Sequence, residues 1–142
     1  MSVVDASVWI SYLVWEDEHH NETVAWMDSI SASSQSLEGP SLLLVEVAGA
    51  VARRTGRTEA ALRLVARLRS TSALRLHPFN EGQLSTHIEL AARLRLRAAD
   101  VVYIALAREL GVPLITWDRQ QRDRALGHIS VMTPTEAMAG GQ

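Results

Sequence analysis

Short apolar segments that suit β-strands alternate along this chain with longer segments of helical periodicity. The strand candidates are residues 3–4, 74–78, 113–116 and 129–132, and the helical candidates are residues 7–14, 22–30, 42–55, 58–70, 81–96 and 98–110. β-branched and alternating apolar residues favour strands, whereas apolar residues three and four apart favour helices. This alternation predicts an α/β fold in which helices flank a central parallel sheet of four to five strands.

The length of the chain suits one domain. Its 142 residues contain no internal repeat and no long linker, so residues 1–142 are expected to form one unit. Gly39, Pro40 and Ser41 are interpreted as a break after a small-residue loop at residues 31–36, with Ser41 as a candidate helix cap. The Gly- and Ala-rich residues 134–142 are expected to form a frayed tail.

Two residue types that carry much enzyme chemistry are missing from the sequence. It has no cysteine, which excludes disulfides, thiolate catalysis and Cys-ligated zinc. All 14 basic residues are arginine, so a Schiff-base lysine and a Walker lysine are excluded as well. The five histidines are scattered without zinc-ligand spacing. No apolar run approaches the roughly 20 residues of a membrane helix and no leader pattern opens the chain, so a cytoplasmic protein without a membrane partner is expected.

The arginines gather in two groups, although the net charge of the chain is −2. Seven lie between residues 53 and 75, and three lie between residues 93 and 97. One interpretation is that they form solvated helix faces in an arginine-rich sequence. The other is that they bind a nucleic acid, because the planar guanidinium suits phosphate. Charge alone does not decide between the two.

Four acidic residues interrupt segments that are otherwise apolar. Asp5 ends the first predicted strand, and Asp118 follows the strand at residues 113–116. Glu46 lies inside the apolar helix LLLVEVAGAV, and Asp100 stands near the start of another apolar helix. An isolated carboxylate in apolar surroundings is unfavourable unless it is neutralised or paired. The positions of these four residues therefore require an explanation.

Each carboxylate has a structural explanation. Asp5, Asp100 and Asp118 stand where an acidic side chain caps or favours the start of a helix, which stabilises by roughly 0.5–2 kcal/mol. Glu46 lies within a helix and has no capping role, but an arginine on a neighbouring helix would pair with it.

The four side chains taken together favour a metal site instead. Ligands bind where the carboxyl ends of parallel strands meet, so Asp5 and Asp118 belong at that edge, and Asp100 reaches it from a helix N-terminus. A cluster of carboxylates is unfavourable without a cation, and all-oxygen sites select hard ions such as Mg²⁺ or Mn²⁺. Beside arginine-rich helices, such a pocket suggests metal-assisted hydrolysis of phosphodiester bonds.

Three motifs follow one another at suitable spacing, namely VVDASVWISYL, LLLVEVAGAVARR and RAADVVYIALARELGVPLITWDRQQR. In this order they resemble the PIN-domain ribonucleases, and among them the VapC toxins of bacterial toxin–antitoxin pairs. The resemblance runs from residue 3 to about residue 132, and its third motif is the most specific. It implies a single PIN-like domain.

The resemblance implies roles for the four acidic residues. Asp5, Glu46 and Asp100 match the three core acidic positions of the family, and Asp118 matches a more variable fourth position. All four are thereby implied to be catalytic residues and to bind Mg²⁺ or Mn²⁺.

Four neighbouring residues receive lesser roles. Thr116 and Ser7 match hydroxyl positions that support the acidic site in the family. Trp117 stands where many relatives carry a smaller residue, so this chain departs from the pattern at the strand end. Asp123 is interpreted as a surface residue.

The resemblance implies an endoribonuclease that cuts single-stranded or looped RNA and serves as the toxin of a VapBC-type pair. A VapB-like antitoxin would neutralise it by filling the acidic groove with its C-terminal tail. A homodimer is also implied, to which Trp15 and Trp26 are candidate contributors unless they pack in the core. Two alternatives stay open: a PIN-type RNA-processing nuclease without an antitoxin, and a catalytically silent PIN module that binds RNA or protein.

Overall fold

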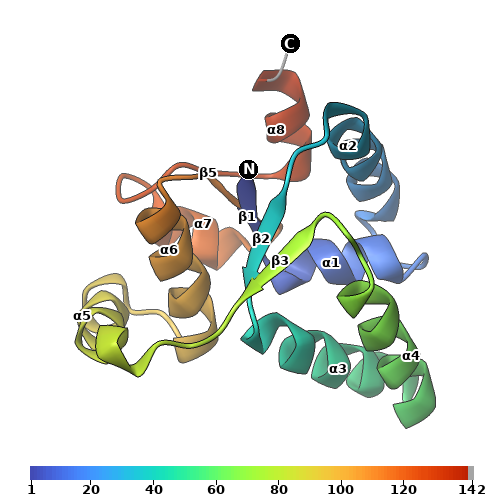
Figure 1. The fold of residues 1–142 in the computed structure, drawn as a ribbon, viewed down its shortest axis with the longest axis horizontal. Helices are drawn as coiled ribbons and strands as arrows, with labels where there is room; N and C mark the ends of the chain where they lie inside the picture. The colour runs from blue at the N-terminus through green and yellow to red at the C-terminus, as the bar shows by residue number, and fades with distance from the viewer. Residues whose placement is uncertain (141–142) are drawn as a thin grey trace.

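Five parallel strands form one sheet in the computed structural model, which describes residues 1–140 (Figure 1). The strands are β1 (Ser2–Val4), β2 (Leu37–Pro40), β3 (Leu74–His77), β4 (Leu114–Ile115) and β5 (Val131–Met132), in the order β3-β2-β1-β4-β5. In the central strand β1, Val3 pairs with Glu38 on one side and with Leu114 on the other. The predicted α/β fold with a central parallel sheet is confirmed.

Helices cover the sheet from two sides. They are α1 (Ala6–Leu13), α2 (His20–Ser33), α3 (Leu42–Thr55), α4 (Thr58–Arg69), the 3₁₀ turn η1 (Glu81–Gln83), α5 (Leu84–Leu94), α6 (Ala98–Leu110), α7 (Arg119–Ala125) and α8 (Pro134–Gly140). Figure 1 shows α5 and α6 to the left of the strands and α1, α2 and α4 to their right. Within residues 1–140, no helix combines the length and the apolar character needed to cross a membrane.

Apolar periodicity explains why α6 forms and where it packs. Its buried residues recur at helical spacing and include Val101, Ile104 and Ala107, and the helix contacts β1, β2 and β4. The helix ends at Gly111, whose φ of +64° is a left-handed conformation that glycine adopts without strain.

Two tryptophans that are candidates for a dimer surface lie in different environments. Trp26 on α2 is only 2% exposed and belongs to the hydrophobic core, so for this residue the alternative of core packing holds and a dimer contact does not. Trp15, in the turn after α1, is 75% exposed. An apolar contact with a partner therefore depends on Trp15 rather than on Trp26.

Strand β2 differs from the sequence prediction, which treats Gly39 and Pro40 as a break. Pairing continues past the proline because the Ser41 N–H donates to the His77 carbonyl at 2.8 Å. A Cβ on Gly39 would lie 3.2 Å from Leu43 Cδ2, so glycine lets α3 start close to the sheet. Ser41 precedes α3, but its side chain makes no cap hydrogen bond.

Residues 134–140 form helix α8, so the prediction of a frayed tail is wrong for them. The Thr133 hydroxyl accepts from the Glu136 N–H at 3.1 Å, and the Glu136 carboxylate accepts from the Thr133 N–H at 2.7 Å. This reciprocal capping box satisfies N–H groups that a helix start leaves free, and α8 then packs against α2 and β5. Residues 141–142 of the predicted tail lie outside the described residues.

Candidate functional site

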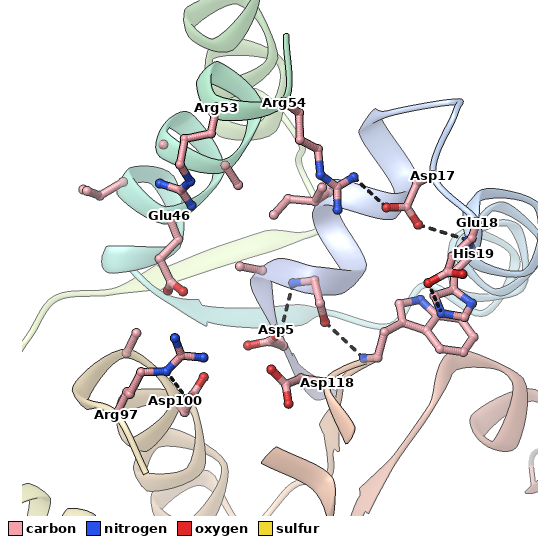
Figure 2. Close-up of a pocket in the computed structure, with 18 residues that line it drawn as sticks. Asp5, Asp17, Glu18, His19, Glu46, Arg53, Arg54, Arg97, Asp100 and Asp118 are labelled. Atoms are coloured by element: carbon pink, nitrogen blue, oxygen red, sulfur yellow. Dashed lines mark hydrogen bonds and ion pairs between the residues drawn. The ribbon is translucent and has the colours of Figure 1, made fainter. Parts of the chain in front are cut away.

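Four carboxylates from four different elements line one pocket of about 520 Å³ (Figure 2). Asp5 follows β1 directly, and Asp118 comes three residues after the end of β4. Glu46 lies in the second turn of α3, and Asp100 lies in the first turn of α6. Strand β4 lies on one side of β1 in the sheet, whereas β2 and β3, which follow β1 in the sequence, lie on its other side. The carboxylates thus meet at the topological switch point, where parallel α/β sheets bind ligands.

Asp5 is the most deeply buried of the four, with 6% of its surface exposed. It caps α1, since its Oδ2 accepts from the Ser7 N–H at 2.9 Å, and its Oδ1 accepts from Gln121 Nε2 at 3.4 Å. Burial raises the pKa of Asp5 against these hydrogen bonds, and the negative charge of Asp118 raises it further. Both donors are neutral, so they do not balance the charge of the ionised side chain.

Glu46 is held by a tyrosine rather than by the arginine that the sequence suggested as an alternative. Tyr103 Oη donates to Glu46 Oε1 at 2.8 Å. Burial raises the pKa of Glu46 to about 7, with further contributions from Asp5 and Asp100. Burial also raises the pKa of the Tyr103 phenol, which therefore stays protonated as a donor.

Asp100 and Asp118 combine a helix-start position with membership of the cluster. Asp118 caps α7 by accepting from the Gln121 N–H at 2.9 Å. Asp100 has Arg97 Nε at 3.8 Å, yet burial and the charges of Asp118 and Asp5 raise its pKa. These two residues therefore stand at helix starts, as their structural explanation requires, and also belong to the carboxylate cluster.

Hydroxyl groups fix the end of β4 beside Asp5. Ser7 Oγ accepts from the Trp117 N–H at 3.0 Å, and Thr116 Oγ1 accepts from the Asp118 N–H at 3.0 Å. The two hydroxyls lie 3.3 Å apart and share a hydrogen bond. Asp123 is exposed and does not line the pocket.

Three arginines line the same pocket. Arg54 is paired with Asp17 at 2.8 Å, whereas Arg97 lies near Asp100. The Arg53 side chain passes close to Gly49: a Cβ added to Gly49 would lie 3.1 Å from Arg53 Nη1. In Figure 2 the side chains of Arg53 and Arg97 flank Glu46. Cationic groups therefore border the carboxylates without neutralising Asp5.

The donor set fits a hard divalent cation. The pocket offers carboxylate oxygens, the ligands that such ions prefer, from four elements. Burial and mutual repulsion raise the pKa of three of these carboxyl groups, those of Asp5, Glu46 and Asp100. As the side chains are oriented, no three His, Asp or Glu residues between 1 and 140 already form a compact ligand set. Binding an ion at this site would therefore require small side-chain adjustments among the four carboxylates.

Residues 2–126 match the PIN domain family. The chain belongs to that family. No curated protein sequence matches it. Among solved structures it resembles Mycobacterium tuberculosis VapC20, described as a sarcin–ricin loop cleaving toxin, with 19% identity, a TM-score of 0.72 and coverage of 91% of this chain and 96% of that one. It also resembles Neisseria gonorrhoeae FitAcB (20% identity, TM-score 0.72, 94% and 98% coverage) and Rickettsia felis VapBC2 bound to a promoter DNA fragment (12%, 0.70, 93% and 97%).

Sequence reasoning missed three residues that shape the site of this PIN domain. Tyr103 lies three positions after Asp100, a spacing that places both on one helix face, so it was open to discovery from the sequence. Gln121 bridges Asp5 and the Asp100 carbonyl, and no sequence signal marks it. His19 lines the pocket from the turn before α2, in a polar segment without periodicity.

The raised pKa of Glu46 predicts how the free energy of unfolding of the metal-free protein depends on pH. Its pKa rises from 4.5 to about 7 on folding, so the folded chain binds this proton more tightly than the unfolded chain does. The free energy of unfolding should therefore increase as pH falls from about 7.5 towards 4.5. Urea unfolding at several pH values in the presence of EDTA measures this slope.

The Glu46→Gln protein provides the comparison for that slope. It should show a distinctly flatter profile between pH 7.5 and 4.5, because the proton-binding group is gone. Glu16→Gln is the matched control, since Glu16 is exposed in the turn between α1 and α2. A slope that Glu46→Gln leaves unchanged would contradict the assignment of the raised pKa to Glu46.

Proposed function

We propose that this chain is a Mg²⁺- or Mn²⁺-dependent endoribonuclease and the toxin of a VapBC-type toxin–antitoxin pair. The observation that carries the proposal is the convergence of Asp5, Glu46, Asp100 and Asp118 in one pocket at the switch point of a PIN fold. Carboxylates whose pKa is raised by burial and by one another are unfavourable when ionised, and a divalent cation removes that penalty.

The chain's own residues would hold the ion and the substrate. Asp5, Glu46 and Asp100 are the proposed ligands, with Asp118 as the fourth. When bound, the ion supplies Lewis acidity at a phosphoryl oxygen and lowers the pKa of nearby water. Tyr103 orients Glu46, and the Ser7 N–H orients Asp5, so both carboxylates are positioned before substrate arrives.

Arginines at the pocket margin would position the RNA backbone. Arg53 and Arg97 border the carboxylates, and guanidinium groups bind phosphate oxygens in a bidentate manner. Their contacts carry no base information, so they account for RNA binding in general rather than for the choice of a cleavage site.

An antitoxin is the proposed regulatory partner. Solved structures with this fold include a Klebsiella pneumoniae toxin–antitoxin complex, Rickettsia felis VapBC2 bound to promoter DNA and Neisseria gonorrhoeae FitAcB. A VapB-like C-terminal tail with arginine would complement a pocket lined by six acidic residues, namely Asp5, Asp17, Glu18, Glu46, Asp100 and Asp118. A homodimer is proposed as well, with exposed Trp15 as an apolar contributor.

Two other functions are distinguishable from this one. A PIN-type RNA-processing nuclease would have the same site but no neighbouring small gene for a DNA-binding partner. A catalytically silent module would bind RNA or protein without cleavage, and all four acidic positions are filled here, which favours catalysis.

Incubating the purified protein with cellular RNA, with and without divalent cations, tests the proposal. We expect new RNA ends at a small number of positions with Mg²⁺ or Mn²⁺, and none with EDTA. Sequencing of 5′ ends after a short incubation measures both. Cleavage that persists undiminished in EDTA, or no cleavage with either ion, would contradict it.

A further inference from the structure

Two aromatic rings lie stacked at one end of the acidic pocket. The ring centroids of His19 and Trp117 are 4.0 Å apart, and the ring planes differ by only 7°. Both residues line the pocket together with the carboxylates. The His19 side chain is 37% exposed, so the stack presents an aromatic ring to solvent within the pocket.

Hydrogen bonds on both sides hold this stack in place. The Trp117 indole N–H donates to Thr23 Oγ1 at 2.9 Å, and its backbone N–H donates to Ser7 Oγ. The His19 backbone N–H donates to Asp17 Oδ1 at 3.0 Å. The Trp117 ring is thereby held through its indole N–H, and its backbone through Ser7, before any ligand binds, which reduces the entropy lost on binding.

Ser7 connects the stack to the acidic cluster. Its backbone N–H contacts Asp5, and its hydroxyl contacts the backbone of Trp117, the residue before Asp118. Figure 2 shows His19 on one side of Asp5, with Arg53 and Arg97 on the other. The pocket therefore has an aromatic end, where Asp17 and Glu18 lie beside His19, and a cationic end at Arg53 and Arg97, with Asp5 between them.

We infer that the His19–Trp117 stack is a platform on which an unpaired RNA base next to the cleaved phosphate stacks. This inference rests on the proposed nuclease function and adds to it the group that selects a single-stranded substrate. Aromatic rings stack on any base but require it to be unstacked from its neighbours, so the platform discriminates against duplex RNA. The phosphates of the same strand would then lie towards the arginines.

Binding measurements with an inactive full-length protein test the platform without cleavage. In the Asp5→Asn background with Mg²⁺ at a fixed salt concentration, a labelled single-stranded RNA is titrated and fluorescence anisotropy is recorded. His19→Ala should weaken binding about tenfold, within the range that loss of one base stack produces. His19→Phe, which keeps a ring, should retain binding within about threefold. His128→Ala is the matched control, because His128 is exposed and lies outside this pocket.

A set of RNA probes with one abasic position each identifies the stacked base. At one position, loss of the base should weaken binding to the parent about tenfold and leave binding to His19→Ala unchanged. Equal binding of all probes by the parent, or unchanged binding by His19→Ala, would overturn the platform. If the wild type still cleaves RNA in that case, the nuclease proposal stands alone. If the wild type cleaves nothing but base-dependent binding is lost in His19→Ala, the stack binds a base without any cleavage and the nuclease proposal fails.

Discussion

The Asp5→Asn protein should cleave RNA at least about a hundredfold more slowly than the wild type in the presence of Mg²⁺. Asparagine keeps the shape of the side chain and still accepts from the Ser7 N–H to cap α1, so the fold should persist. What it removes is the negative charge of the most buried proposed ligand. Initial rates with a single-stranded RNA under single-turnover conditions measure the loss.

The same substitution in α7 provides the control for this loss. Asp123→Asn makes an identical chemical change at an exposed residue outside the pocket, and its rate should stay within about twofold of the wild type. Circular dichroism of both variants checks that they are folded. An Asp5→Asn protein that is folded and cleaves at the wild-type rate would show that Asp5 does not act in catalysis.

Divalent cations should raise the melting temperature of the wild type by an amount on the order of 5–10 °C at a hundred times the dissociation constant. An ion that binds only the folded chain at this concentration stabilises it by about 2.7 kcal/mol. It also offsets the burial penalty and the mutual repulsion that raise the pKa of Asp5, Glu46 and Asp100. Differential scanning fluorimetry with Mg²⁺ and Mn²⁺ against EDTA measures the shift.

Substitutions in the cluster should separate metal binding from general salt effects. Asp5→Asn should melt higher than the wild type in EDTA, since it removes a charge that burial disfavours, and it should respond weakly to the ions. Glu46→Gln should lose more than half of the metal-induced shift. Glu16→Gln should respond as the wild type does. An equal shift in Asp5→Asn and the wild type would mean that the ion binds elsewhere.

The sequence predicted those helices and strands that show a regular apolar period and also carry a residue that typically begins or ends such an element. The bounds of α6 agree with the prediction because its apolar residues recur regularly and Gly111 ends it. Strand β2 was missed because it contains Gly39 and Pro40, and its stability comes from pairing with both β1 and β3 rather than from local preference. Helix α8 was missed because small residues hide a capping box and a contact with α2.

The gathering of Asp5, Asp100 and Asp118 followed from strand ends and a helix start, which topology places at one edge of the sheet. Glu46 lies within α3, and only the resemblance to the PIN family placed it with them. The contacts that tune each carboxylate did not follow. Gln121 reaches Asp5 across 116 positions of sequence, and the stacking of His19 on Trp117 joins a turn to a strand end. Such contacts depend on how distant elements pack, for which a single sequence has no local signal.

The central position of β1 has a consequence for fragments of this protein. Asp5 directly follows β1, but β1 pairs with β4, and Asp118 follows β4 in the same pocket. A fragment that ends before residue 114 therefore lacks both the neighbouring strand and one wall of the pocket. The four carboxylates can gather only when segments far apart in the sequence pack together, so a cut between α6 and β4 should separate Asp5 from Asp118.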